Sequence, residues 1–494
     1  MTEQKNAIPE SWGQANLEDI CDILDSFRIP VNNSERSKRI AGKLPDKLYP
    51  YYGATGQVGV IDDYIFEGEH ILLGEDGAPF LDPFKNKAYL VSGKFWVNNH
   101  AHILKAAVSN KYLCYYLNQI GYSDHVTGTT RLKLNQTALR KIPVRVAPTN
   151  EQHRIVAKIE TLFSELDKGI ESLKTAREQL KVYRQAVLKH AFEGKLTAQW
   201  REENKDKLES PEQLLARIQQ ERQDRYQKQL QDWQTAVKAW EKNGKEGRKP
   251  GKPRGPDLSS PLTDREISDR YELPDSWAWK TIGELFGVFV GSTPSRKKQD
   301  YWGGHIPWVS SGEVAFCSIK ETREKITKIG YENTSTDLHP VGTVMLAMIG
   351  EGKTRGQAAI LHIQSAHNQN TAAVRVSESG CMPEYIYYFF LYQYEMTRRL
   401  GSGNNQKALN KQRVSMMAVP LCSTFEQSAV VEEIELKLSV IEKNEQEINH
   451  ALHQSEVLRQ SILKKAFSGE LVSQDHSDGT TRKLISHKNV RAVL

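Results

Sequence analysis

Apolar and small residues recur along residues 151–196 at alternating steps of four and three, with mostly charged and amide residues between them. This period predicts a long amphipathic helix whose apolar stripe forms a heptad seam. The seam consists of Ile155, Ile159, Leu162, Leu166, Gly169, Leu173, Ala176, Leu180, Tyr183 and Val187. A single seam of this kind also fits a solvated helix that packs on its own domain.

The helix pattern occurs twice. Residues 151–196 align without a gap with residues 426–471, at an offset of 426 − 151 = 275. The second seam consists of Val430, Ile434, Lys437, Ile441, Asn444, Ile448, Ala451, Ser455, Leu458 and Ile462. Its polar members interrupt the stripe, and buried polar positions can fix the register and the pairing partner of a helix. Two copies in one chain favour helices that pair with each other.

The beginning of each half repeats as well. Pro9-Glu10-Ser11-Trp12 is answered by Pro274-Asp275-Ser276-Trp277, at an offset of 277 − 12 = 265. A period this long is typical of duplicated domain-plus-helix modules rather than of a solenoid. If the helices pair in an antiparallel sense, each of about 43 residues spans roughly 65 Å and carries the domains to opposite ends. We then expect a pseudo-twofold tandem repeat.

The globular segments contain strand-like apolar runs bounded by turn residues, together with two helical patterns, which predicts an α+β class. The strand-like runs are 58–61, 71–73, 88–91, 95–97, 342–349, 358–363 and 371–376, and the helical ones are 111–120 and 383–400. The predicted boundaries are a first domain 1–149, a spacer helix 150–197, a polar insert 198–270, a second domain 271–424, a spacer helix 425–472 and a flexible tail 473–494.

The insert carries its own signals. Ser210-Pro211-Glu212-Gln213 has a capping-box pattern with proline at the first helical position, which predicts a helix or a helical hairpin. Residues 243–256 are rich in Gly, Pro, Lys and Arg and are expected to form a flexible linker. The linker fits either an arm that touches phosphates or a solvated tether. We favour the tether, because no aromatic residue is interleaved with its charges.

Composition narrows the function classes. The formal net charge is +6 over 494 residues, and residues 242–254 contribute +5 of it, so overall charge supports nucleic-acid binding only weakly. The five cysteines form no C-x-x-C pair, which argues against a disulfide framework and a zinc site. No apolar run approaches the roughly 18 residues of a membrane span, so we expect a cytoplasmic protein without membrane association.

Short motifs in both halves resemble the target recognition domains of type I restriction–modification specificity subunits. In the first half they are Tyr51-Tyr52-Gly53-Ala54-Thr55-Gly56-Gln57, Gly74-Glu75-Asp76-Gly77-Ala78 and Trp96-Val97-Asn98-Asn99-His100-Ala101-His102. In the second half they are Gly291-Ser292-Thr293-Pro294-Ser295, Tyr301-Trp302-Gly303-Gly304-His305-Ile306-Pro307-Trp308-Val309, Arg355-Gly356-Gln357-Ala358-Ala359 and Asn368-Gln369-Asn370. The resemblance covers the chain except the insert around 200–260 and the tail after residue 473.

The resemblance implies a non-catalytic subunit that reads a bipartite double-stranded DNA target, one block per domain. It implies two adenine-N6 methyltransferase subunits and restriction–translocase subunits as partners, with the helical seam also docking the methyltransferase subunits. The chain itself would bind no cofactor and no metal, whereas S-adenosylmethionine, ATP and Mg²⁺ would serve the partner subunits. Two rivals remain: a coiled-coil scaffold whose domains bind protein, and a self-contained modification enzyme, which the missing methyl-donor and adenine-pocket motifs disfavour.

Loops with amides, hydroxyls and cations are the candidates for DNA contact, because these groups read base edges and phosphates. Residues 127–135 align with 402–410 at the same offset of 275. We expect Leu134 and Asn135, like Leu409 and Asn410, to form a shared structural turn, and phosphate rather than base contact for 295–298. The candidates are Thr129, Thr130, Arg131, Lys133, Ser295, Arg296, Lys297, Lys298, Lys353, Arg355, Asn404, Asn405, Gln406 and Lys407.

Two other signals are weaker. Residues 347–354 satisfy a relaxed phosphate-loop pattern, but a strand-like run follows where a helix should hold the phosphate, so we do not expect nucleotide binding. His100 and His102 could share a strand face as a metal pair, yet no third ligand is evident and a hydrogen-bonded structural role is favoured. For Tyr51, Tyr52, Trp302 and Trp308 we favour core packing over base stacking.

Overall fold

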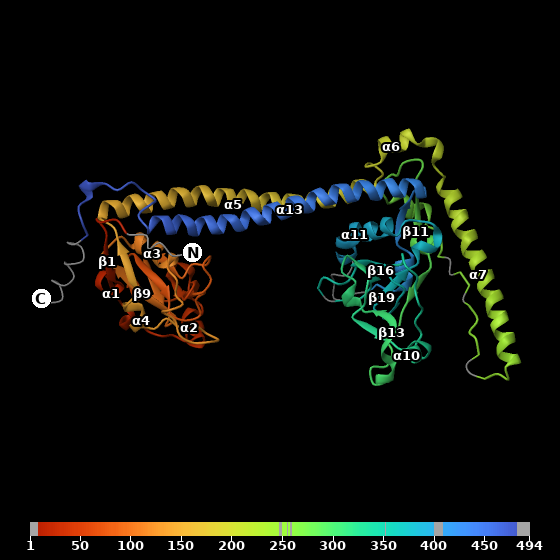
Figure 1. The fold of residues 1–494 in the computed structure, drawn as a ribbon, viewed down its shortest axis with the longest axis horizontal. Coiled ribbons are helices and arrows are strands. Elements are labelled where there is room, and N and C mark those ends of the chain that lie inside the picture. Colours follow the sequence, from red (N-terminus) through yellow and green to blue (C-terminus); the bar gives the residue numbers. More distant parts are fainter. Residues whose placement is uncertain are drawn as a thin grey trace. The chain divides into compact units, whose positions relative to one another are not determined.

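The structure, a computed structural model, describes residues 8–246, 249–253, 255–256, 259–350, 352–399 and 409–481 (Figure 1). It divides into two compact units, Met1–Arg177 with Gln446–Leu494, and Glu178–Glu445. Each unit contains one globular domain, hereafter the first and the second globule. The two long helices are α5 (Thr149–Phe192) and α13 (Thr424–Ala466). Each of them is divided between the two units, α5 after Arg177 and α13 after Glu445.

The first globule is built from two four-stranded sheets and a short strand pair. One sheet has the order β2-β9-β6-β7, the second has the order β4-β3-β8-β5, and β1 pairs with β10. The strands are β1 (Gly13–Asn16), β2 (Cys21–Ile23), β3 (Tyr49–Gly53), β4 (Gly56–Ile61), β5 (Phe66–Glu67), β6 (His70–Gly74), β7 (Ala88–Val91), β8 (Lys94–Val97), β9 (Ala101–Ala106) and β10 (Pro143–Val146). The helices are α1 (Leu17–Ile20), α2 (Asn33–Ile40), α3 (Asn110–Gln119) and α4 (Gln136–Arg140).

The second globule repeats this plan. Its sheets have the orders β12-β19-β16-β17-β14 and β15-β13-β18, and β11 pairs with β20. The strands are β11 (Ala278–Thr281), β12 (Val288–Val290), β13 (Trp302–Val309), β14 (Cys317–Ile319), β15 (Glu324–Ile326), β16 (Val344–Ala347), β17 (Ala358–Leu361), β18 (Ala366–His367), β19 (Thr371–Val374) and β20 (Ala418–Leu421). The helices are α8 (Asp264–Ser268), α9 (Ile282–Leu285), α10 (Lys328–Glu332), α11 (Pro383–Arg399) and α12 (Lys411–Ser415). The expected α+β class and the tandem repeat are confirmed.

Strand periodicity explains why the central strands are apolar on both faces. On β6, Ile71 and Leu73 point into the main core, whereas Leu72 points into a second cluster. On β16, Val344 and Leu346 lie in the main core of the second globule, with Met345 in a separate cluster. Successive side chains of a strand alternate between faces, so a strand covered on both sides needs a continuous apolar run.

The duplication extends to single hydrogen bonds. In the first unit Trp12 Nε1 donates to Glu151 Oε2 at 3.0 Å, and in the second Trp277 Nε1 donates to Glu426 Oε2 at 2.9 Å. Each indole therefore ties the start of a globule to the start of its long helix. The equivalent residues Asn135 and Asn410 cap α4 and α12 through their side chains, which confirms the expected structural turn.

The long helices run antiparallel within each unit. In the first unit Arg459 pairs with Asp167, and Arg177 Nη1 donates to Asn449 Oδ1 at 3.4 Å. In the second unit Arg184 contacts Glu445 at 3.1 Å and Glu442 at 3.9 Å. Residue numbers that rise on one helix fall on the other, as antiparallel pairing requires.

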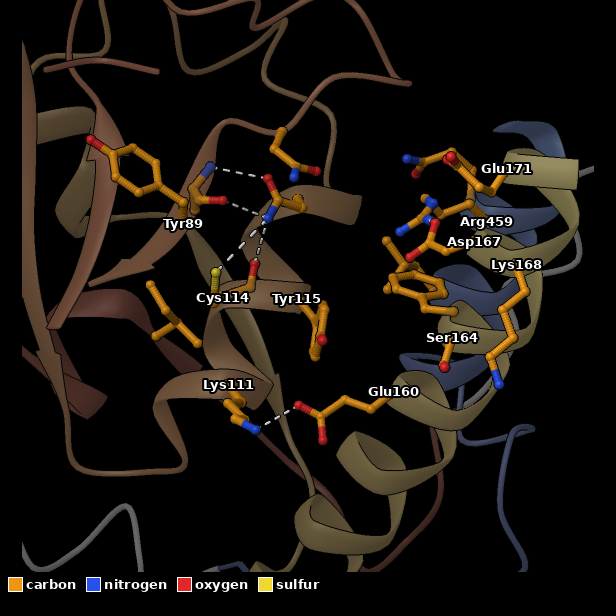
Figure 2. A pocket seen from close by; sticks show the side chains of 17 residues that line it. Tyr89, Lys111, Cys114, Tyr115, Glu160, Ser164, Asp167, Lys168, Glu171 and Arg459 are labelled. Carbon is orange, nitrogen blue, oxygen red and sulfur yellow. Dashed lines mark hydrogen bonds and ion pairs between the residues drawn. The ribbon is translucent and has the colours of Figure 1, made fainter. Parts of the chain in front are cut away.

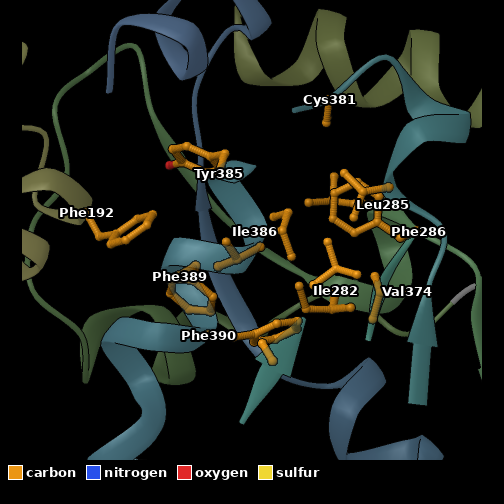
Figure 3. Close-up of a cluster of buried hydrophobic side chains, with 14 of the residues drawn as sticks. Phe192, Ile282, Leu285, Phe286, Val374, Cys381, Tyr385, Ile386, Phe389 and Phe390 are labelled. Atoms are coloured by element: carbon orange, nitrogen blue, oxygen red, sulfur yellow. The ribbon is translucent and has the colours of Figure 1, made fainter. Parts of the chain in front are cut away.

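The ends of the long helices complete the globular cores. Phe192, at the end of α5, lies with its ring 5.3 Å from those of Tyr385 and Phe389 of α11, inside the main core of the second unit (Figure 3). At the equivalent end of α13, Phe467 packs 5.1 Å from Tyr112 in the first unit. Each core therefore contains the start of one long helix and the end of the other.

The polar insert is partly ordered onto the second globule. It holds α6 (Ala198–Glu203) and α7 (Pro211–Lys242), and α7 begins after the Ser210 capping box as predicted. Ile218 packs into the main core, and the buried Arg222 donates to Gly283 O at 3.1 Å. Linker residue Pro250 accepts a hydrogen bond from Trp233 of α7 at 3.0 Å. The described residues around position 250 therefore contact α7, although no aromatic residue is interleaved with the charges of the linker in the sequence.

Of the tail predicted at 473–494, the structure describes residues 473–481, which contact the start of α5, and residues 482–494 lie outside the described residues. Gln474 Nε2 donates to Glu151 Oε1 at 2.6 Å, and Asp478 pairs with Arg154 at 2.6 Å. These contacts tie residues 474–478 to the start of α5. No apolar period predicts these contacts, because the polar side chains of this short segment bind individual partners rather than an apolar face.

Candidate nucleic-acid interface

The first candidate loop is a tight hairpin at residues 127–133. Thr127 and Lys133 exchange backbone hydrogen bonds of 2.9 and 2.8 Å. Gly128 has φ +104°, and a Cβ at this position would lie 2.5 Å from the carbonyl oxygen of Arg131. Glycine is therefore required there, and the hairpin holds Arg131 at its exposed end.

Arg131 and Lys133, the two cations of this hairpin that were predicted to contact DNA, each form an ion pair with a carboxylate in the turn after β6. Arg131 Nη2 lies 2.9 Å from Asp76 Oδ1, and Lys133 Nζ lies 3.2 Å from Glu75 Oε1. Glu75 also receives Arg28 at 2.6 Å. The side chains of Arg131 and Lys133 remain 60% and 52% exposed, so both stay accessible to a ligand. Thr129 and Thr130 are exposed beside them.

A buried polar pair supports this hairpin from below. His102 Nδ1 lies 2.6 Å from Asp25 Oδ2, and its Nε2 lies 2.8 Å from Leu134 O. Burial alone raises the pKa of Asp25, but the hydrogen bond and charge of His102, the Ile103 N–H and the charge of Arg28 together outweigh burial and leave this pKa below its ordinary value. His102 thus holds the chain where the hairpin ends.

Asp25, Glu75 and His102 could together offer three ligand atoms to a metal ion. Both ring nitrogens of His102 already face oxygen atoms, and Glu75 is neutralised by Arg28 and Lys133. This arrangement fits a structural network rather than a metal centre. His100 does not join it, because its Nδ1 lies 2.6 Å from Asp76 instead.

The second candidate loop, residues 295–298, is exposed throughout. Arg296 forms a two-contact ion pair with Glu324, with Nη2 and Oε2 2.8 Å apart, and its Cζ lies 3.8 Å from the Trp302 ring centroid. The hydrogen bond between them raises the pKa of Arg296 and lowers that of Glu324. Lys298 Nζ donates to Tyr301 Oη at 2.9 Å. Ser295 precedes Arg296 in the sequence, and Lys297 lies between Arg296 and Lys298.

The loop after β16 supports only part of its prediction. β17 follows this loop as a strand, as the sequence indicated, so no helix N-terminus is available to a phosphate. Lys353 is exposed, whereas Arg355 is half-buried and donates to Arg398 O at 3.1 Å at the end of α11. Arg355 therefore joins the loop to the end of α11, and its contact with DNA stays a prediction. Asn404, Asn405, Gln406 and Lys407 lie outside the described residues.

A basic helix escaped the sequence analysis. On α2, the guanidinium of Arg36 lies 5.1 Å from the ring centroid of Tyr51, and that of Arg39 lies 4.8 Å from Trp96. Arg39 also pairs with Asp62 at 2.6 Å. The sequence does contain a sign of this helix, because Arg36 and Arg39 follow the capping residue Asn32 at a spacing of three. The helix is too short to show an apolar period.

The aromatic residues divide between the two roles that the sequence left open. Tyr51 and Trp308 are buried, as core packing predicts. Trp302 is half-exposed and lies under the Arg296 guanidinium, so it forms part of the surface of the second loop.

The ends of the predicted heptad seam are buried within the chain. These residues lie in the globular cores and offer no surface to a partner: Ile155, Ile159, Val187, Val430, Ile434, Ile441 and Ile462. The middle of the seam is half-buried, at Leu162, Leu166, Leu173, Leu180 and Ile448. Methyltransferase contact stays a prediction for this middle part.

The heptad assignment is wrong at several positions. Tyr183 and Leu458 are each 51% exposed, and Asn444 is exposed. Phe163 and its equivalent Leu438 are buried one residue after the assigned positions. The helical period of 3.6 residues drifts from an ideal 3.5 repeat, so a straight helix moves its apolar stripe by about one position over several turns.

The two outward-facing positions belong to repeated apolar pairs. Val182 and Tyr183 on α5 have the equivalents Val457 and Leu458 on α13, since 182 + 275 = 457. All four side chains are exposed large hydrophobics. Their recurrence at equivalent positions of both long helices makes them a candidate surface for protein contact.

A cavity of about 710 Å³ lies in the first unit between α3 and the long helices (Figure 2). Lys111 pairs with Glu160 across it at 2.6 Å, and Arg459 pairs with Asp167. Lys168 and Glu171 complete a lining with three cations and three carboxylates. This balance does not favour a polyanion such as DNA.

Within the described residues, no helix is both long and apolar enough to cross a membrane.

The sequence was compared with known proteins. Residues 9–175 and 274–453 match the type I restriction modification DNA specificity domain, once in each half. A putative type I restriction enzyme specificity subunit of Haemophilus influenzae is 32% identical over 148 residues, which are 30% of this chain and 36% of that protein. The EcoDI specificity subunit of Escherichia coli is 23% identical over 481 residues, which are 94% of this chain and 93% of that protein.

Solved structures share the fold. A chain from a study of complex assembly and conformational transition of the type I R-M system has a TM-score of 0.61 at 13% identity, covering 94% of this chain and 99% of its own. The HsdS subunit from Thermoanaerobacter tengcongensis has a TM-score of 0.50 at 14% identity, covering 95% and 100%. The sequence match spans more than half of the chain, and the chain therefore belongs to the type I restriction modification DNA specificity domain family.

Proposed function

We propose that this chain is the sequence-reading subunit of a type I restriction–modification complex and that each globule reads one block of a bipartite DNA target. One observation carries the proposal: single hydrogen bonds of the scaffold recur at equivalent positions in both halves, whereas in the aligned sequence Arg131 of the first half is replaced by Gln406 in the second. The first globule presents Arg131 beside Asp76, and the second presents Arg296 beside Glu324. Two domains that share one backbone scaffold but carry different exposed side chains can each recognise a different block of DNA sequence.

The long helices support a fixed gap between the blocks. At 1.5 Å per residue, the 44 residues of α5 are about 66 Å long. DNA rises about 3.4 Å per base pair, so a spacer of this length limits the separation of the blocks to about 19 base pairs.

The repeated apolar pairs support docking of two methyltransferase subunits, one at Val182 and Tyr183 and one at Val457 and Leu458. A pseudo-twofold repeat presents the same surface twice and so suits a partner bound in two copies. Restriction–translocase subunits are the further partners. In this proposal the chain performs no catalysis, and S-adenosylmethionine, ATP and Mg²⁺ belong to the partner subunits.

The first test is a base-resolution map of N6-methyladenine in DNA treated with an adenine methyltransferase subunit, with and without this chain. A split motif that requires the chain supports the proposal. Methylation of the same sites in both reactions, with the complex formed, would instead favour a scaffold whose globules bind protein.

Stoichiometry has a separate test. Native mass spectrometry should find two methyltransferase subunits on the wild type and one on either V182D/Y183D or V457D/L458D. Val58→Asp, which changes an exposed valine of β4, is the matched control and should retain both. Two bound subunits on every variant would refute this docking surface.

A further inference from the structure

The Arg131 side chain is held in one direction without being covered. Its Nη2 donates to Asp76 Oδ1 at 2.9 Å, the single partner recorded for this guanidinium among the described residues. A guanidinium has five N–H donors, so most of its planar fork stays available. An exposed arginine with this restraint loses little conformational freedom when it binds a ligand.

The carboxylate that restrains Arg131 is itself rigidly placed. Asp76 follows β6, and its turn is pinned to the hairpin by Leu134 N donating to Glu75 O at 2.7 Å and Gly77 N donating to Leu132 O at 3.4 Å. Its side chain is only 18% exposed. Arg131 thus projects from a fixed frame rather than from a free loop.

We propose that Arg131, oriented by Asp76, reads a guanine in the block recognised by the first globule. The inference rests on the proposed function, and it adds a base identity and a residue to it. The free N–H groups of the fork match the N7 and O6 acceptors that guanine presents in the major groove. Asp76 supplies the orientation that such a two-bond contact requires.

The surrounding charges select a base over a phosphate. Asp76 and Glu75 both lie beside the hairpin cations, at 2.9 Å from Arg131 and 3.2 Å from Lys133. Asp76 offsets the charge of Arg131 and so weakens the attraction of Arg131 for a phosphate group, whereas the edge of guanine carries no net charge and is not repelled by the carboxylate. A phosphate contact would carry no sequence information, whereas a contact with a base edge would.

The experiment uses the complex of the full chain with its methyltransferase subunit and a randomised duplex library, followed by sequencing of the methylated products. The variants are Arg131→Lys, which keeps the charge but loses the fork, and Asp76→Asn, which removes the orienting carboxylate. Arg140→Lys is the matched control, because Arg140 is an exposed arginine of the same globule that pairs with Glu18 at 3.4 Å.

The expected result is that Arg131→Lys lowers the preference for one guanine by about tenfold or more, in one block only, as loss of a two-bond base contact requires. Asp76→Asn should lower the base preference at the same position of the motif, and Arg140→Lys should leave the base preference unchanged at every position. An unchanged motif, a block without guanine, or a uniform loss of methylation without a change in preference would overturn the inference. A wild type that yields no split motif would instead refute the proposed function.

Discussion

A chain of buried hydrogen bonds in the second globule makes its stability sensitive to mild acid. Arg375 Nε donates to His339 Nδ1 at 3.1 Å, His339 Nε2 lies 3.0 Å from His367 Nε2, and His367 Nδ1 lies 2.7 Å from Thr371 Oγ1. Because arginine can only donate, His339 must carry its hydrogen on Nε2 and His367 on Nδ1. Both rings are then neutral, and each has one hydrogen.

An added proton on either ring opposes this arrangement. On His367 it would set two N–H groups against each other, in a site where both rings are fully buried. Burial lowers the pKa of His367 to about 4 from its ordinary 6.5, and burial, repulsion from a protonated His367 and the charge of Arg375 lower the pKa of His339 well below 6.5. Glu378, 3.5 Å from Arg375, is the nearby carboxylate and partly offsets the arginine charge.

The sign and size of the effect follow from linkage. Between pH 6.5 and 4, His367 is protonated in the unfolded chain but stays neutral in the folded protein. The free energy of unfolding is therefore highest above pH 6.5 and falls as the pH decreases. The limit is 6.5 − 4 = 2.5 pKa units, or about 3 kcal/mol. At pH 5 the loss for His367 alone is about 2 kcal/mol, and His339 adds to it in the same direction.

The assay is hydrogen exchange with mass spectrometry on peptides that cover β18 and β19, between pH 7.5 and 5, corrected for the intrinsic exchange rate. The double variant H339Q/H367Q removes both titrating groups and serves as the reference. We expect the opening free energy of these strands to fall by about 2 kcal/mol more in the wild type than in the variant. Equal pH dependence in both proteins would refute the neutral relay.

Three further predictions concern the scaffold. Gly194→Ala forces φ +69° on alanine and places its Cβ 2.6 Å from Pro274 Cγ. Gly42→Ala is the control, because Gly42 has a similar φ of +72° but no atom within 4 Å of an added Cβ, so we expect it to lower the free energy of unfolding by roughly 1 kcal/mol. Thermal unfolding should show a larger loss of stability for Gly194→Ala. Trp277→Phe removes a hydrogen bond to buried Glu426 and should cost about 1–2 kcal/mol in urea unfolding; an unchanged midpoint would contradict it. Lengthening α5 and α13 by one heptad adds about 10 Å and should widen the gap of the methylated motif by about three base pairs without altering either block.

Periodicity explains how much of the fold could be predicted from the sequence. The 275-residue offset located both long helices, and apolar runs located the central strands β6, β16 and β19, because burial repeats along regular elements. The exact seam failed at Tyr183 and Leu458. Whether a half-apolar position faces the neighbouring helix or solvent depends on the packing of each globule, which no local pattern contains.

The candidate site was less accessible to sequence analysis. Arg131 was found because it lies in a repeated loop, but its partner Asp76 is 55 residues away in the chain. Arg296 and Glu324 are 28 residues apart. Contacts of this kind join loops that only the folded sheets bring together, and a charged loop residue in the sequence does not reveal whether a carboxylate orients it.

The two globules support their exposed loops with different buried polar groups. In the first, the His102 ring holds Leu134 O at the base of the hairpin. In the second, the backbone carbonyl of His367 accepts from Ser292 N at 3.0 Å, at the start of the segment that leads to Arg296, while its ring belongs to the relay. Buried polar groups are costly unless each one is satisfied, so a network and the loop above it must change together. Two globules built on the same general plan of two sheets can therefore each acquire their own supported loop and, with it, their own block of DNA sequence.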